Sequence, residues 1–147
     1  MKIDLKIDPA CTQPHIVVVA KAITPEVTEI LQKLSELQAP QVLAGFKEEM
    51  VELLVPESIV RIYAEGQKVY VQTEAELYQI KMRLYEAEEK LDAAVFVRIS
   101  NSEIINLKMV LNMDISLSGT ICIRLKGGVS TYASRRFVPK IKKMLGI

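Results

Sequence analysis

Short segments rich in β-branched and aromatic residues follow one another from about Met50 to the end of the chain, with turn residues between them. Gly and Pro mark many of the boundaries, as in Pro56-Glu57-Ser58 and Lys126-Gly127-Gly128. Strands spaced about 8–12 residues apart are typical of a β sandwich or another twisted β assembly. The expected strands are residues 50–55, 59–64, 68–73, 77–81, 95–99, 108–115, 120–125 and 129–133.

Two short helices are expected within this β-rich region, which makes the chain an α+β protein. Residues 83–91 place apolar side chains on one side at helical spacing. Near the C-terminus, Phe137, Ile141 and Leu145 recur every four residues, and Ser134 precedes them as the expected N-cap.

The first 48 residues carry a different pattern, which predicts a small β-β-α segment. Residues 2–7 alternate aliphatic and charged side chains, which is typical of a half-buried strand, and residues 15–21 favour a buried strand. Thr24-Pro25 is a helix start, and Pro40 is expected to end that helix before a short strand at 41–46. The expected domains are therefore residues 1–48 and residues 49–147.

The charge is unevenly distributed, although the formal net charge is only +1. Residues 1–50 hold five basic and seven acidic side chains, whereas residues 115–147 hold seven basic side chains and no acidic one. Such asymmetry hints at a polyanionic partner near the C-terminus. The longest apolar run, residues 16–20, is too short for a membrane span, and no export signal is recognisable, so a cytoplasmic location with reduced cysteines is expected.

Few residues suggest an enzyme. The single histidine, His15, precedes an apolar segment, where a structural role is more common than a catalytic one. Gly127-Gly128 lacks the lysine and the strand-loop-helix context of a phosphate loop. Cys11 and Cys122 are far apart and do not have metal-ligand spacing. We therefore expect no catalytic site, no metal and no cofactor.

Two loop-borne sets, residues 96–107 and 132–138, combine small hydroxyl residues with Asn or Arg. Arg pairs with guanine and Asn with adenine in the major groove, and hydroxyl groups suit phosphate oxygens. Each set also has a structural alternative. Ser100-Asn101-Ser102 is a plausible turn, and Ser134-Arg135-Arg136 is a plausible cap followed by a solvated helix start.

At these residues the chain resembles the LytTR-type DNA-binding domain, an output module of bacterial transcription regulators. The resemblance covers about two thirds of the chain, from about Met50 to Ile147. Its parts come in the family's order: residues 59–66, the helix at 84–91, Phe96 to Ser102 with Ile105-Asn106, and Ser134-Arg135-Arg136. No one of these parts is specific, but their combination is.

The resemblance implies a mostly β fold of stacked small antiparallel sheets. It implies loops that enter successive major grooves of double-stranded DNA and bind promoter direct repeats. The residues expected to contact bases are Gln67, Lys68, Asn101 and Arg136. The residues expected to contact phosphates are Arg98, Ser100, Ser102, Ser134, Arg135 and Lys140. Arg98 has a structural alternative, since an arginine inside a strand can pair with a carboxylate.

The N-terminal segment departs from the commonest family architecture, because residues 1–46 are too short for a receiver domain. Receiver-less members are often paired with a membrane protein that restrains them, and two copies are expected at least on DNA. The N-terminal segment is a candidate dimer interface or an extension of the core. The alternative function is a protein-interaction subunit that does not bind DNA, in which the basic helix at 135–145 docks an acidic partner. No small-molecule substrate is expected.

Overall fold

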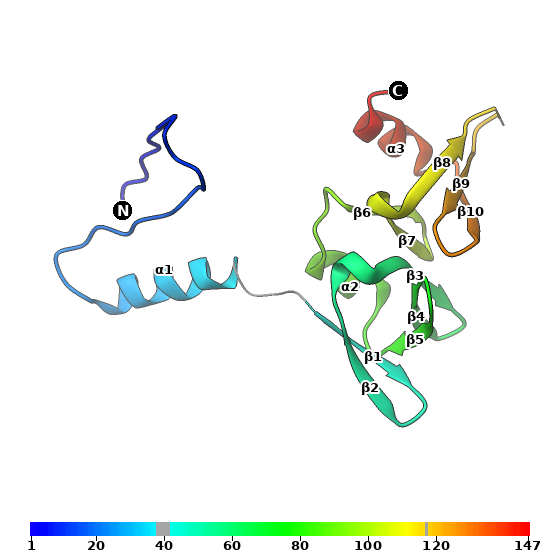
Figure 1. Ribbon diagram of the computed structural model, residues 1–147, viewed down its shortest axis with the longest axis horizontal. Coiled ribbons are helices and arrows are strands. Elements are labelled where there is room, and N and C mark those ends of the chain that lie inside the picture. Colours follow the sequence, from blue (N-terminus) through cyan, green and yellow to red (C-terminus); the bar gives the residue numbers. More distant parts are fainter. Residues whose placement is uncertain (38–41, 117) are drawn as a thin grey trace. The chain divides into compact units, whose positions relative to one another are not determined.

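A computed structural model describes residues 1–37, 42–116 and 118–147 of the chain (Figure 1). The chain divides into two compact units, Met1–Ala39 and Pro40–Ile147. We describe each unit by itself.

The first unit contains one helix, α1 (Pro25–Glu36). Thr24 caps it as predicted, because its Oγ1 accepts a hydrogen bond from the Val27 backbone N–H at 3.3 Å, and Pro25 occupies the first turn. Its last residue is Glu36, with Leu37 as the C-cap, and the predicted stop at Pro40 lies outside the described residues. None of the twelve residues of α1, all described, is fully buried.

The strands predicted at residues 2–7 and 15–21 are not formed. Residues 1–23, which the structure describes in full, contain turns and irregular chain only. Ile3, Leu5 and Ile7 remain 79–87% exposed. A strand requires a hydrogen-bonded neighbour, and residues 1–37 of this unit supply none, so the sequence pattern is not sufficient to form one.

The second unit is built mainly from antiparallel strands, as predicted. Each strand that was expected from residue 50 onward is present, and its first and last residues lie within two positions of the expected ones. Its strands are β1 (Leu43–Lys47), β2 (Met50–Leu54), β3 (Ile59–Glu65), β4 (Lys68–Thr73), β5 (Leu77–Ile80), β6 (Phe96–Ser100), β7 (Glu103–Asn106), β8 (Val110–Asp114), β9 (Ile121–Leu125) and β10 (Val129–Ala133). Its α-helices are α2 (Leu84–Lys90) and α3 (Val138–Leu145), and its short 3₁₀ turns are η1 (Pro56–Ser58) and η2 (Leu107–Met109).

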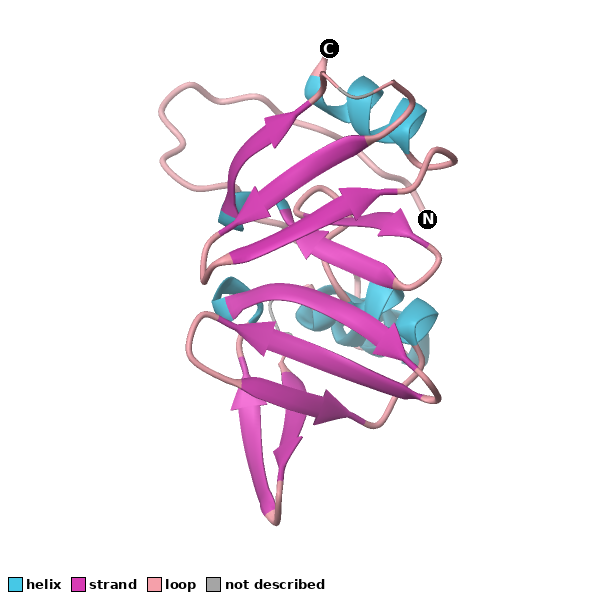
Figure 2. Cartoon of the chain, turned by 90° about the vertical axis from the view of Figure 1, so that its right-hand side faces the viewer, coloured by secondary structure: helices cyan, strands magenta, loops and turns pink. Residues whose placement is uncertain are grey.

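Two sheets form in this unit. The larger has the strand order β2-β1-β5-β4-β3-β7-β6, and the smaller has the order β10-β9-β8. Figure 2 shows most strands stacked one above another with turns along their two flanks, whereas the hairpin of β1 and β2 extends from the lower end of the stack. Strand β1 pairs with β2 and contacts β5 through Phe46 and Gln79, so it extends the larger sheet. The compact units therefore separate before β1, whereas the sequence analysis placed the end of the N-terminal segment at residue 48.

Strand β7 was not predicted, because residues 96–107 were interpreted as one loop-borne set. All four residues of β7 are buried. Ile104 belongs to the apolar cluster that α2 covers, and the next residue, Ile105, belongs to the cluster that α3 and the smaller sheet cover. A strand buried on both faces shows no alternation of polar and apolar residues, which is why periodicity does not reveal it.

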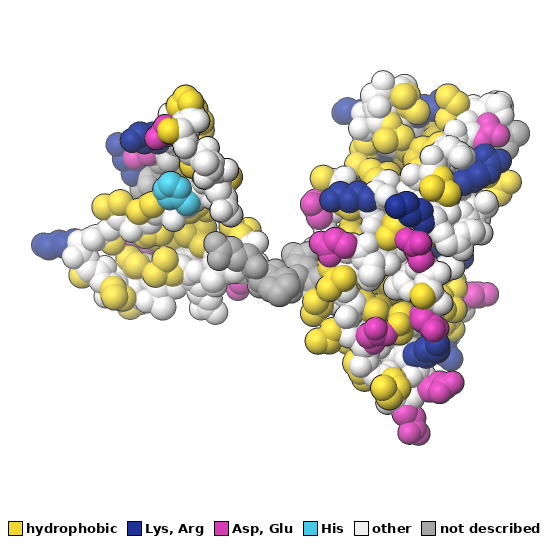
Figure 3. Space-filling view, in the orientation of Figure 1, with side chains coloured by type: hydrophobic (Ala, Val, Ile, Leu, Met, Phe, Trp, Pro, Cys, Tyr) yellow, Lys and Arg dark blue, Asp and Glu magenta, His cyan; other side chains and the backbone are white. Residues whose placement is uncertain are grey.

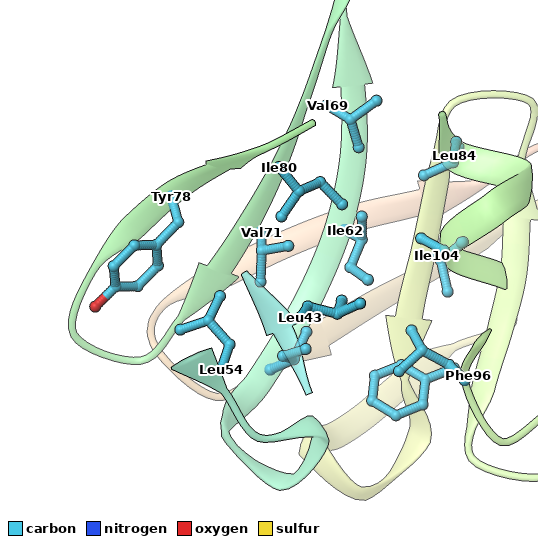
Figure 4. Packing of buried hydrophobic residues seen from close by; sticks show 13 residues of the cluster. Leu43, Leu54, Ile62, Val69, Val71, Tyr78, Ile80, Leu84, Phe96 and Ile104 are labelled. Atoms are coloured by element: carbon cyan, nitrogen blue, oxygen red, sulfur yellow. The ribbon is translucent and has the colours of Figure 1, made fainter. Parts of the chain in front are cut away.

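Two apolar clusters hold the second unit together. Figure 4 shows part of the first, where Ile62, Val71 and Ile80 from neighbouring strands pack with Leu84 of α2 on the same side of the sheet. The second cluster joins the opposite face of the larger sheet to β9, β10 and α3. Both faces of β6 and β7 are therefore fixed by packing, and the turns at their ends are held with them.

Candidate nucleic-acid interface

Three turns of the second unit carry the residues predicted to contact DNA bases. The first turn joins β3 to β4 and holds Gln67, with Lys68 at the start of β4. The second joins β6 to β7 and holds Asn101. The third follows β10 and holds Arg136. All four side chains belong to exposed residues.

Two backbone hydrogen bonds place these turns side by side. The Ala64 N–H, near the end of β3, donates to the Ser102 carbonyl at 2.8 Å, and the Ser134 N–H donates to the Ile99 carbonyl at 2.9 Å. The turn with Asn101 is therefore the middle member of a row along one edge of the unit. We call this row of residues 65–68, 100–102 and 134–137 the three-turn edge.

The Arg98 side chain stabilises the middle turn by hydrogen bonds to its backbone carbonyls. Its Nε donates to the Ser100 carbonyl at 2.8 Å, its Nη2 donates to the Asn101 carbonyl at 2.5 Å, and its Nη1 lies 3.6 Å from a carboxylate oxygen of Glu88. The Arg98 side chain is only 19% exposed. These contacts correspond to the structural alternative for Arg98, with two backbone carbonyls as partners in addition to the carboxylate.

Hydroxyl groups tighten the same turn. The Ser102 N–H donates to Ser100 Oγ at 3.2 Å, and the two serine hydroxyl oxygens lie 3.4 Å apart. Because the carbonyl of Asn101 is held by Arg98, its exposed amide side chain projects from a fixed backbone. A side chain on a fixed turn loses less conformational entropy when it binds a partner.

A buried carboxylate, which the sequence analysis missed, ties the strands that lead into the three-turn edge. Glu103 is 9% exposed, accepts a hydrogen bond from Thr131 Oγ1 at 2.8 Å and pairs with Arg61 Nη1 at 3.3 Å. Arg61 Nε also donates to Gln72 Oε1 at 2.8 Å. The network therefore joins β3, β4, β7 and β10. In the sequence, the one feature that could have indicated this buried residue is the position of Glu103 directly before the apolar pair Ile104-Ile105.

The third turn differs from its prediction. Helix α3 begins at Val138 with Phe137 as the N-cap, so Ser134 is not the cap. The Ser134 carbonyl instead accepts the Phe137 N–H at 2.9 Å and closes a turn around the two arginines. Both arginines are exposed, and Arg136 lies 5.8 Å from the Phe137 ring centroid. Because this turn ends at Phe137 and α3 begins at Val138, the two arginines lie before the helix and not within it.

Arg135 lies over the turn between β8 and β9. A Cβ built on Gly119 would lie 3.3 Å from Arg135 Nε, and the positive φ of Gly119 (+77°) also favours glycine there. Lys140 is exposed on α3. In the face shown in Figure 3, acidic side chains are more frequent near β1 and β2 than near β8–β10 and α3. Of the basic C-terminal residues, Arg135 and Arg136 belong to the three-turn edge, whereas Arg124 and Lys126 lie toward the other end of β9, where it joins β10.

Asn106, part of the resemblance, is a structural residue. It is 1% exposed, donates from Nδ2 to the Ile59 carbonyl at 2.8 Å and accepts the Lys108 N–H at 2.9 Å. These bonds join β7 to β3 and begin η2.

The remaining candidate groups are separate from this edge. His15 and Cys11 are exposed in the first unit, whereas Cys122 is buried in β9. Across the described part of the chain, His, Cys, Asp and Glu side chains do not converge in a group of three that could bind a metal. The described helices are all too short or too polar to cross a membrane.

Comparison with known proteins agrees with this geometry. Residues 49–146 match the model of the LytTr DNA-binding domain. The chain is 29% identical over 147 residues to proteins of Staphylococcus aureus strains MRSA252 and COL, named uncharacterized HTH-type transcriptional regulators, with 100% of this chain and 99% of each relative covered.

A solved LytTr DNA-binding domain from Bacillus cereus shares the fold, with a TM-score of 0.69 and 21% identity over 72% of this chain and 97% of that one. The LytTr family model covers about two thirds of the chain. This chain belongs to the LytTR family of DNA-binding transcription regulators, which are not enzymes, and residues 49–146 are its DNA-binding domain.

Proposed function

We propose that the three-turn edge reads double-stranded DNA in a sequence-specific way and that the chain regulates promoters carrying direct repeats. The observation that carries the proposal is the pair of backbone bonds, Ala64 to Ser102 and Ser134 to Ile99, which brings three separate turns into one row. Each turn presents an exposed Gln, Lys, Asn or Arg, which are the side chains that pair with base edges in a major groove.

We assign the base contacts to Gln67, Lys68, Asn101 and Arg136. We assign the phosphate contacts to Ser100, Ser102, Ser134, Arg135 and Lys140, because hydroxyl and basic side chains suit phosphate oxygens. Arg98 is assigned a positioning role, since its guanidinium already binds two carbonyls of the middle turn. Members of the family bind successive major grooves at direct repeats, and we propose the same mode of DNA binding for this chain.

Two copies are expected on a direct repeat, and a membrane protein that restrains the regulator is a candidate partner. A DNA-binding regulator works where the chromosome lies, which supports the expected cytoplasmic location. The competing function is a protein-interaction subunit in which the basic residues at 135–145 dock an acidic partner.

The test selects binding sites from a random duplex library and then measures affinity by fluorescence anisotropy at several salt concentrations. Asn101→Ala and Arg136→Ala are each expected to cost about 1–3 kcal/mol of binding and to relax selectivity at one base position. Lys90→Ala, at the exposed end of α2, is the matched control and should change neither.

Affinity should fall steeply with salt, because phosphate neutralisation supplies much of it. Failure to enrich any site, together with no retention on duplex DNA at low salt, would favour the protein-interaction alternative. Enrichment of a site with unchanged selectivity in both alanine variants would contradict the base assignments.

A further inference from the structure

Residues 2–8 form an amphipathic segment that has no strand partner among the residues that the structure describes. Aliphatic Ile3, Leu5 and Ile7 alternate with charged residues and are 79–87% exposed. Lys2 Nζ lies 3.8 Å from Asp4 Oδ1, so these two charges lie on the same side of the segment. At its end, Asp8 Oδ1 accepts the Ala10 N–H at 3.0 Å and begins a turn. The segment therefore has the pattern of a strand, with one apolar face left in solvent.

We propose that residues 2–8 pair with the same residues of a second copy, as two antiparallel strands related by a two-fold axis at Leu5. In this register Leu5 lies opposite Leu5 of the second copy, and Ile3 lies opposite Ile7. All apolar pairs then share one face. On the other face, Lys2 lies opposite Asp8 and Asp4 lies opposite Lys6, so each charge meets its opposite.

Charge selects this register over its neighbours. An axis at Asp4 would place Asp4 against itself and Lys2 against Lys6. An axis at Lys6 would place Lys6 against itself and Asp4 against Asp8. A shift by one position would bring aliphatic and charged side chains onto one face. The register centred on Leu5 therefore avoids like charges and keeps the apolar face intact.

Symmetry removes the parallel arrangements. Two parallel strands in register would place Lys2 opposite Lys2 and Asp4 opposite Asp4. A parallel pair offset by two residues has matched charges, but it is not two-fold symmetric and leaves a free complementary edge on each copy. Only the antiparallel pair forms a closed assembly of two chains.

A second copy fits the segment better than the other extended region of the same unit. Residues 15–21 contain no acidic side chain, so they cannot match Lys2 and Lys6. A two-stranded ribbon by itself is marginal and needs its apolar face covered. A hollow between residues 13–18 and α1 is lined partly by apolar Ile16, Val18, Leu31 and Leu34 and partly by polar Gln13, His15 and Ser35. Its apolar part is the surface that we assign to this cover. This inference does not depend on DNA binding.

The first experiment measures self-association of the full chain without DNA by sedimentation equilibrium. Asp4→Lys and Lys6→Asp each convert two opposite-charge pairs into like-charge pairs, so each is expected to weaken the dimer about tenfold. The double variant Asp4→Lys with Lys6→Asp restores opposite charges and should dimerise as the parent chain does. An equal mixture of the two single variants should also form dimers.

Several outcomes would overturn the proposal. The proposal would be refuted if the parent chain stays monomeric up to about 100 μM. A dissociation constant of that size corresponds to a binding free energy of about −5 to −6 kcal/mol. Single variants that associate as strongly as the parent, or a double variant that is not restored, would place any interface elsewhere. Because residues 2–8 are exposed, these changes leave the fold of the second unit intact.

The second experiment tests the register with cysteine cross-linking in a Cys11→Ser background. Leu5→Cys places two thiols opposite each other at the axis, within reach of a disulfide. Ile3→Cys is the matched control, since it is equally exposed but its two copies would lie about 13 Å apart along the strands. Rapid cross-linking of the first and slow cross-linking of the second is expected. Equal rates would refute the register.

Discussion

Residues 2–7 and strand β4 carry the same kind of sequence pattern and end in different states. Lys2–Ile7 and Lys68–Thr73 both alternate polar and β-favouring side chains. Strand β4 lies between β3 and β5, and its Val69 and Val71 are at most 8% exposed. In the first unit Ile3 and Leu5 remain 86–87% exposed. The comparison shows that alternation indicates the capacity to form a strand, whereas a neighbouring strand decides whether it forms.

The largest expected difference between the two units comes from truncating matched isoleucines. Ile104→Ala removes a fully buried side chain and should lower the free energy of unfolding of the second unit by about 2–5 kcal/mol. Ile3→Ala, which removes the same atoms from an exposed site, should change it by less than about 0.5 kcal/mol. Urea denaturation followed by circular dichroism measures both. Similar losses would contradict the described difference in burial.

The next comparison sets a partly buried ion pair against an exposed one. Glu103→Gln keeps an oxygen for Thr131 but removes the charge that faces Arg61, so we expect a loss of about 1–3 kcal/mol in unfolding free energy. Asp4→Asn removes a carboxylate from an ion pair whose side chains are 86% and 75% exposed, and it should be close to neutral. Both are measured at low protein concentration. A neutral Glu103→Gln would show that the network does not hold β7 and β10 together.

The third comparison separates a residue that positions the three-turn edge from a residue beside it that is proposed to contact phosphate. Arg98→Ala should weaken DNA binding by about 1–2 kcal/mol through loss of the bonds to Ser100 and Asn101, with an unchanged slope of affinity against salt. Lys140→Ala should reduce that slope by about 0.9, because one phosphate contact is lost. Anisotropy titrations at a series of salt concentrations measure both. A reduced slope for Arg98→Ala would return Arg98 to the phosphate contacts.

The smallest expected effect is a pH dependence confined to the second unit, which holds all five tyrosines. The hydrogen bond from the Tyr78 hydroxyl to Glu52 raises the pKa of Tyr78 to about 12. The folded state therefore favours the protonated phenol. This contribution is complete below pH 10 and is lost as the pH rises from about 10 through about 12. Tyr78→Phe should remove that part of the decline in the denaturation midpoint, and identical pH profiles would contradict it.

Much of the fold followed from local patterns. The spacing of turn residues and β-branched segments predicted the strands of the second unit, and the apolar spacing at 83–91 predicted α2. Strand β7 was missed because Ile104 and Ile105 are buried on opposite faces, which removes the alternation that marks a strand. The strands expected at residues 2–7 and 15–21 were wrong, because neither segment pairs with a neighbour within the described residues.

The candidate site divides in the same way. The motifs around Asn101 and Arg136 suggested the residues that we propose for DNA contact, because turn-forming and base-pairing side chains are visible in a linear sequence. Their common edge depends on the bonds from Ala64 to Ser102 and from Ser134 to Ile99. The contacts of Arg98 and the buried Glu103 likewise involve partners that no local pattern indicates.

From the sequence alone one could predict most strands of residues 50–147, the helix α2 and the basic C-terminal stretch, and one could nominate the residues that we propose for DNA contact. The tertiary structure decided which strands have partners, which side chains are buried on two faces and which turns share an edge. The physical reason is that periodicity and turn chemistry act within a few residues. Strand pairing joins residues as far as 44 positions apart, as Arg61 and Ile105 show, and the Glu103 network joins residues 42 positions apart.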